Sequence, residues 1–94
     1  MDIEMLKRWR RAERERLVAA RLALDAATLE SWRQSIDTHI ERAFPGLAKA
    51  TVAICWPIRN EYDPRHLARR LRAHGARTAL PVVLAPATPL AFRE

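Results

Sequence analysis

The first 44 residues follow the hydrophobic period of an α-helix. Residues 3–23 contain no Gly or Pro, and their apolar side chains recur every three to four positions. Asp25 then has the residue type of a helix cap. The apolar side chains that follow it fall on one face: Leu29, Trp32, Ile36 and Ile40. The pattern predicts helices over 3–23 and 26–44, the second ended by Pro45 and Gly46.

After residue 50 the hydrophobic pattern changes period. The run "TVAICW", residues 51–56, is continuous, apolar and rich in β-branched residues, which is typical of a strand buried on both faces. Asp63 as a cap and Pro64 at the first helical position then predict a third helix, which Gly75 ends. The segments "RTALPVVLA" and "PLAFRE" predict a second and a third strand.

Strand, helix and strand in about 30 residues form a right-handed βαβ unit with a parallel pair of strands. The sequence therefore predicts the α/β class, with two N-terminal helices followed by a βαβ unit of a parallel or mixed sheet. We expect residues 1–94 to form a single domain, with a helical part over 1–45 and a βαβ part over 50–94. These elements do not cover both faces of a parallel sheet. The expected architecture is an incomplete three-layer α/β domain, completed by a C-terminal half or by a partner chain in a dimer.

Composition narrows the classes of partner and location. The 94 residues include 17 Lys and Arg against 11 Asp and Glu, a formal net charge of +6. This balance favours an anionic partner such as nucleic acid, nucleotide phosphates or polyglutamate. Composition alone does not choose among these, but the arginines are mixed with acids along the chain, which weakens the case for nucleic acid. We expect a cytoplasmic protein with no membrane partner, because the chain has no long apolar run, no secretory signal and a single cysteine.

The cysteine and the histidines give little indication of a functional site. Cys55 lies within the first strand run and is expected to be a small buried hydrophobe. The three histidines, His39, His66 and His74, have no metal-ligand spacing. The sequence contains no Gly-rich phosphate loop, no CxxC pair and no catalytic triad signature.

The stretch "VAICWPIRNEYDPRHL" places an aromatic ring, a cation and a carboxylate directly after a strand. In open α/β sheets, ligands bind beyond the carboxyl ends of the strands. Trp56, Arg59 and Glu61 are therefore candidates for binding a flat, polar heterocycle. A plainer interpretation stays open, in which Trp56 is a core residue, Arg59 is solvated and Glu61 supports the Asp63 cap.

A basic row marks the first predicted helix. Lys7, Arg10 and Arg14 are spaced i, i+3 and i+7, so they share a helix face that can bind a phosphate chain. The alternative is a solvated face that forms exposed ion pairs with neighbouring acids, Glu4, Glu13 and Glu15.

Four segments of the chain, in their order along the sequence, resemble the N-terminal half of the 5-formyltetrahydrofolate cyclo-ligases, also called 5,10-methenyltetrahydrofolate synthetases. The basic helix and the next helix cap read "RWRRAERERLVAARLALDAATLESWRQSI". A strand, an aromatic residue and an acid five positions later read "VAICWPIRNEYDPRHL". A helix ending in Gly and a strand with Leu-Pro read "LRAHGARTALPVV", and "PLAFRE" follows. The resemblance covers nearly the whole chain.

The resemblance implies an enzyme that uses ATP and Mg²⁺ to convert 5-formyltetrahydrofolate into 5,10-methenyltetrahydrofolate, ADP and phosphate. It implies that Arg10 and Arg14 bind ATP, with Lys7 as a substitute. Arg10 stands where the family usually has a lysine, which keeps the charge and changes the geometry. The resemblance also implies that Trp56 and Glu61 bind the substrate, the ring packing on the pterin and the carboxylate accepting its N–H groups.

The chain departs from this family in length and in one motif. Members are about twice as long, and their second half carries a Gly-rich run ending in Gly-Tyr-Tyr-Asp that contributes nucleotide, magnesium and folate contacts. The resemblance therefore implies a chain that carries the N-terminal half and is inactive alone. Two alternatives stay open: a small basic α/β binding module for nucleic acid or another anionic partner, and a non-catalytic chain that pairs through an open sheet edge.

Overall fold

Two long helices form the first half of the protein. The computed structural model describes residues 2–94, in which α1 spans Ile3–Leu22 and α2 spans Ala26–Ala43. Asp2 and Asp25 precede the two helices, and the carboxylate of each accepts the N–H three residues further on, at 2.8 and 2.7 Å. These bonds satisfy amides that have no partner within the helix. The two predicted helices and the Asp25 cap are confirmed.

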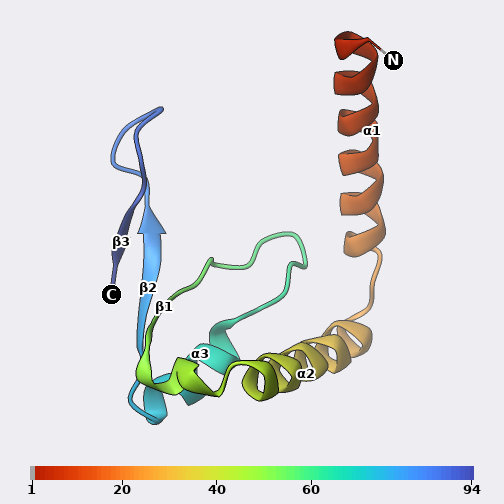
Figure 1. The fold of residues 1–94 in the computed structure, drawn as a ribbon. Coiled ribbons are helices and arrows are strands. Elements are labelled where there is room, and N and C mark those ends of the chain that lie inside the picture. The colour runs from red at the N-terminus through yellow and green to blue at the C-terminus, as the bar shows by residue number, and fades with distance from the viewer. Residues whose placement is uncertain (1) are drawn as a thin grey trace.

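The second half folds into a small mixed sheet with one helix (Figure 1). Its elements are the 3₁₀-helix η1 (Pro45–Lys49), β1 (Thr51–Ala53), α3 (Arg65–Ala73), β2 (Arg77–Val82) and β3 (Ala91–Arg93). β1 pairs in parallel with β2, and β3 pairs antiparallel with β2, which gives the strand order β1-β2-β3. The fold is therefore mixed α/β with an incomplete sheet, as the sequence predicted.

The two ends of α3 follow from local sequence. Asp63 Oδ1 accepts the N–H of Arg65 at 3.0 Å, although the helix begins one residue after the predicted Pro64. At the other end, Gly75 has a φ of 107°, which side-chain-bearing residues rarely adopt. The N–H groups of Gly75 and of the next residue donate to carbonyls of the last helical turn, at 3.1 and 3.0 Å. Gly75 therefore ends the helix in a Schellman motif.

The segment after β1 differs from the predicted strand. β1 ends at Ala53, and beyond it the N–H of Ile54 donates to the Ala79 carbonyl at 2.9 Å. Cys55 is exposed, and Trp56 is 59% exposed. The predictions of a strand over 51–56 buried on both faces, and of a buried Cys55, are wrong. The physical reason is that a strand is buried on both faces only where helices pack over both, whereas β1 packs mainly against its neighbour β2 within residues 2–94.

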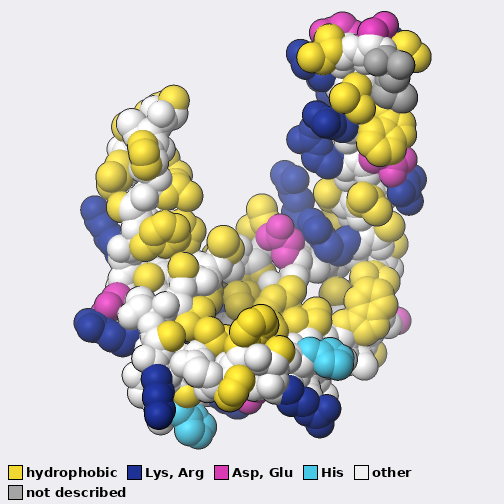
Figure 2. Space-filling model, viewed as in Figure 1, with side chains coloured by type: hydrophobic (Ala, Val, Ile, Leu, Met, Phe, Trp, Pro, Cys, Tyr) yellow, Lys and Arg dark blue, Asp and Glu magenta, His cyan; other side chains and the backbone are white. Residues whose placement is uncertain are grey.

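The protein exposes much more surface than a compact domain of its mass. The accessible surface is 7544 Å², whereas a compact chain of this mass exposes about 5,500 Å². The radius of gyration is 16.9 Å, against about 12 Å for a compact chain of this length. Figure 1 shows the cause, because α1 and the sheet project from opposite ends of the layer formed by α2 and α3. Figure 2 shows that the side chains leave an open space between these two projecting parts. Among residues 2–94, the buried apolar side chains all lie near α3 and β2: Leu67, Ala68, Ala76 and Ala79.

Candidate functional site

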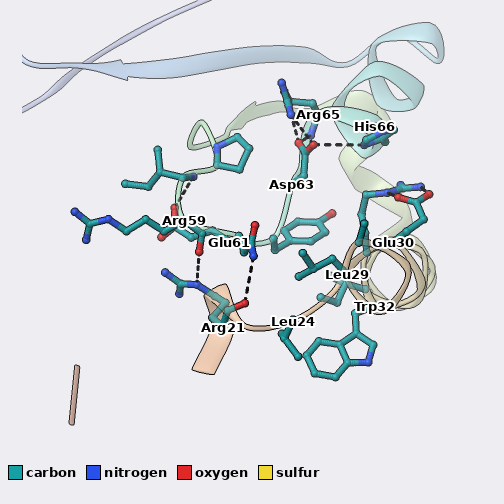
Figure 3. A pocket seen from close by; sticks show the side chains of 17 residues that line it. Arg21, Leu24, Leu29, Glu30, Trp32, Arg59, Glu61, Asp63, Arg65 and His66 are labelled. Atoms are coloured by element: carbon teal, nitrogen blue, oxygen red, sulfur yellow. Dashed lines mark hydrogen bonds and ion pairs between the residues drawn. The ribbon is translucent and has the colours of Figure 1, made fainter. Parts of the chain in front are cut away.

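A cavity of about 490 Å³ lies where the end of α1, the first half of α2 and the loop after β1 meet (Figure 3). We call it the loop pocket. Its apolar lining comes from the connection between α1 and α2, from α2 and from the loop after β1: Leu24, Leu29, Trp32, Ile36, Ile58 and Tyr62. Its charged lining includes Arg21, Arg59 and Glu61. The volume lies within the range of small-molecule sites, roughly 300–1,000 Å³.

The loop wall of this pocket is a tight turn with an uncommon backbone. Arg59 and Asn60 have φ of 50° and 60°, in the left-handed region that Asn tolerates and most other side chains avoid. The N–H of Glu61 closes the turn by donating to the Ile58 carbonyl at 3.0 Å. An arginine in this region costs roughly 1–2 kcal/mol. The surrounding contacts must therefore impose this conformation on the loop.

Contacts with α1 hold the turn from one side. Arg21 Nε donates to the Arg59 carbonyl at 2.7 Å, and Asn60 Nδ2 donates to the Arg21 carbonyl at 3.3 Å. Figure 3 shows both bonds at the end of α1. They join the last turn of α1 to the loop after β1 (residues 54–64) and place the Arg21 guanidinium at the rim of the pocket.

Glu61 has one carboxylate oxygen engaged and one available. Its Oε1 accepts the N–H of Ile58 at 3.0 Å, so the side chain stabilises its own turn rather than the cap at Asp63. No second partner of this carboxylate lies within residues 2–94. An ionised carboxylate can accept several hydrogen bonds. The second oxygen is therefore free to accept N–H groups of a ligand in the loop pocket.

The rest of the rim carries paired charges. Arg33 Nη2 donates to Glu30 at 2.6 Å, and this bond lowers the pKa of Glu30 to about 2. Arg65 Nε donates to Asp63 at 2.8 Å, and this pairing lowers the pKa of Asp63 to about 2. His66 Nδ1 lies 3.8 Å from the Asp63 carboxylate. Both acids are therefore ionised at neutral pH and already have cationic partners, which distinguishes them from Glu61.

Trp56 lies outside the loop pocket. It lines a second cavity, of about 270 Å³, together with residues of α3 and β2. The Arg65 guanidinium lies 4.6 Å from the centroid of its ring, which is a cation–π contact. The structure therefore places Trp56 and Glu61, the two substrate-binding candidates from sequence, in different cavities.

Lys7, Arg10 and Arg14 lie on α1 and line neither cavity. They precede Arg21 by 14, 11 and 7 residues, which are nearly whole numbers of turns at about 3.6 residues per turn. They therefore share the helix face of Arg21, and Figure 2 shows Lys and Arg side chains along the side of α1 that faces the open space. Lys7 Nζ lies 3.7 Å from the Glu4 carboxylate, whereas Arg10 and Arg14 form no ion pair within residues 2–94. The basic row predicted from sequence leads to the rim of the loop pocket.

Sequence reasoning missed a buried carboxylate beside the loop pocket. Asp37, on α2, is 1% exposed. It accepts hydrogen bonds from Arg33 Nη1 at 2.6 Å, from Arg70 Nη2 at 3.2 Å and from the Tyr62 hydroxyl. Burial, and then the bond to Asp37, raise the pKa of Tyr62. The only local signal was the i, i+4 spacing of Arg33 and Asp37, since the other partners are 25 and 33 residues away.

Comparisons of the chain with protein-family models, with curated proteins and with solved structures found no match. Within residues 2–94, no group of three or more His, Cys, Asp or Glu side chains is placed to hold a metal ion. No helix in the same residues has both the length and the apolar character needed to cross a membrane. The function must therefore be argued from the loop pocket and the basic face of α1.

Proposed function

We propose that this protein carries the folate-binding part of an enzyme similar to the 5-formyltetrahydrofolate cyclo-ligases. The observation that supports this most is the loop pocket, which combines an apolar lining with one available oxygen of Glu61. Such a site suits a flat heterocycle that carries several N–H donors. The pterin ring of 5-formyltetrahydrofolate has this chemistry.

The lining residues have distinct roles in this proposal. The available oxygen of Glu61 accepts the amino and ring N–H groups of the pterin, while Leu29 and Tyr62 provide apolar contacts. The guanidinium groups of Arg21 and Arg59 belong to the same lining, and they can pair with the carboxylates of the folate glutamate. The proposed site therefore uses Arg59 in place of Trp56, which lies in the other cavity.

The phosphates of ATP have their candidate partners on α1. Arg10 and Arg14 have guanidinium groups without an acidic partner in residues 2–94, and a guanidinium can bind phosphate through two parallel hydrogen bonds. Lys7 extends the same row. Mg²⁺ is usually held by the nucleotide phosphates and one or two carboxylates, so it needs no dedicated protein cluster. In this reaction class ATP phosphorylates the formyl oxygen, N10 attacks, and phosphate leaves. A cytoplasmic location belongs to the same proposal.

Catalysis needs more polypeptide than residues 2–94 arrange around the pocket. The structure exposes about 2,000 Å² more surface than a compact chain of its mass. Large apolar side chains such as Trp9, Phe92 and Val83 are more than half exposed. We infer that a further segment or a partner chain covers this surface, and that the 94 residues alone bind the substrate without converting it.

Isothermal titration with 5-formyltetrahydrofolate tests this proposal. The informative variant is Glu61→Gln, which keeps an oxygen for the Ile58 N–H and replaces the available acceptor with an NH₂ donor. We expect affinity to fall by about tenfold or more, because a charged hydrogen bond is lost. Glu15→Gln is the matched control, because Glu15 is exposed on α1 and lines neither cavity. Equal affinities of the two variants would refute the role of Glu61, and no binding by the wild-type protein would refute the proposal.

The basic face of α1 supports a second candidate, a small binding module for an anionic partner such as nucleic acid. Arg10 and Arg14 are the residues that favour it, because no acid neutralises them within residues 2–94. A polyanion bound there should lose affinity steeply with added salt. Its binding should be lost in the Arg10→Ala/Arg14→Ala double variant and unchanged in Glu61→Gln. The folate proposal predicts the reverse for 5-formyltetrahydrofolate added without ATP: its binding should weaken in Glu61→Gln and stay unchanged in the Arg10→Ala/Arg14→Ala double variant.

A further inference from the structure

We propose that Asp37 is a positioning residue that holds the loop after β1 (residues 54–64), and with it Glu61, against α2 and α3. Asp37 does not line the loop pocket, so it acts through its partners. The effect on ligand affinity rests on the function proposed above. The effect on the loop itself does not, and it can be measured without a ligand.

The first support for this role is that one carboxylate joins three parts of the chain. Asp37 lies on α2, and its partners are Arg33 on the same helix, Arg70 on α3 and Tyr62 on the loop. Tyr62 directly follows Glu61 in the sequence. The bond between Tyr62 and Asp37 therefore restrains the backbone next to the Glu61 carboxylate.

The second support is that the carboxylate is itself held in place. Arg33 is fixed on its other side by Glu30 at 2.6 Å, and Arg70 is fixed by Glu41 at 2.6 Å. These five residues form an alternating row of charges across α2 and α3. Because Asp37 is 1% exposed and accepts from two arginines that are themselves paired, its side chain is held in one position.

The third support is that the loop has an unfavourable backbone conformation, which contacts with the rest of the protein must maintain. Its turn holds Arg59 and Asn60 in the left-handed region, which an unrestrained loop would leave. The bonds that the turn makes to Arg21 are exposed to water, and α1 has no buried residue. The bond between Tyr62 and Asp37 is part-buried, so water competes with it less.

The first test is amide hydrogen exchange in the Tyr62→Phe variant, which removes one hydroxyl and leaves Asp37 with both arginines. The amides of Ile58 and Glu61 report on the loop, because both are hydrogen-bonded within it. We expect them to exchange about tenfold faster, while the Ala76 amide at the end of α3 keeps its rate. Unchanged loop amides would overturn the proposal. Equal acceleration at Ala76 would also overturn it, because the bond would then serve only global stability.

The second test measures the affinity for 5-formyltetrahydrofolate in Tyr62→Phe and in Glu15→Gln. Glu15→Gln is the control, because Glu15 is exposed on α1, lines neither cavity and is not part of the row of charges around Asp37. We expect a loss of about fivefold or more in Tyr62→Phe and no change in Glu15→Gln. A wild-type protein that does not bind the folate would refute the proposed function, while the exchange experiment would still decide whether Asp37 holds the loop. Equal affinities of wild type and Tyr62→Phe would overturn the link between Asp37 and binding.

Discussion

Replacing Asp37 by alanine should destabilise the whole protein more than any exposed substitution. The change removes three hydrogen bonds to a carboxylate that is 1% exposed. Hydrogen bonds to charged groups contribute roughly 1.5–3 kcal/mol each. The total loss is smaller than their sum, because Arg33 keeps Glu30 and Arg70 keeps Glu41 as partners. Only the Tyr62 hydroxyl loses its sole partner within residues 2–94. We therefore expect a loss of about 3 kcal/mol in the free energy of unfolding.

Urea unfolding followed by far-ultraviolet circular dichroism measures this loss. For a chain of this size the slope is about 1–3 kcal/mol per molar urea, so the midpoint should fall by about 1–3 M. Glu41→Gln is the matched control, because it breaks an ion pair whose side chains are 47% and 45% exposed. Such a pair contributes at most about 1 kcal/mol. If Asp37→Ala shifts the midpoint no further than Glu41→Gln does, the three hydrogen bonds of Asp37 do not stabilise the fold. Asp37 could then not hold the loop after β1 in place.

Three further predictions concern the C-terminal end of α3, the stability of the protein at low pH and the pKa of Tyr62. Gly75→Ala should lower the free energy of unfolding by about 1–2 kcal/mol, because Gly75 has a positive φ that alanine disfavours. Gly46→Ala is the control: the added methyl group meets no atom within 4 Å, so the free energy of unfolding should change by less than about 0.5 kcal/mol. The pKa of Asp63 is lowered from 3.8 to about 2, so its stabilisation is present above pH 4 and is lost as the pH falls toward 2. The difference in melting temperature between wild type and Asp63→Asn should therefore vanish over that interval, and a constant difference would contradict the ion pair. Tyr62 is the only tyrosine, so phenolate absorbance reports its pKa directly. Burial and the bond to Asp37 raise that pKa above 10, and Asp37→Asn should lower it, while no change would contradict the bond.

The elements that sequence predicted correctly have local causes. Asp25 caps α2 through an amide three residues away, and Gly75 ends α3 through its own backbone conformation. The parallel pairing of β1 and β2 follows from the strand, helix and strand order, which leaves few ways to connect them. Each of these features can be recognised in a window of a few tens of residues.

The elements that sequence reasoning missed depend on distant contacts or on which faces of the sheet are covered. The burial of Asp37 results from partners 25 and 33 residues away, which hydrophobic periodicity does not detect. Cys55 is apolar and follows a strand, but that strand packs mainly against β2 and has no helix packed closely over it within residues 2–94, so the expected burial does not occur. Glu61 could be recognised as a candidate because it follows the strand. Trp56 and Glu61 lie in different cavities because of the way the loop turns between them, and local sequence does not reveal that turn.

The most direct test of the central claim is a map of where the folate binds. Two-dimensional amide NMR spectra of the ¹⁵N-labelled protein, recorded during a titration with 5-formyltetrahydrofolate, report on every part of the chain that the ligand touches. We predict that the amides of Ile58, Arg59 and Glu61 shift together with that of Leu29 across the loop pocket. Shifts confined to the second cavity around Trp56, or an unchanged spectrum at saturating folate, would contradict the account.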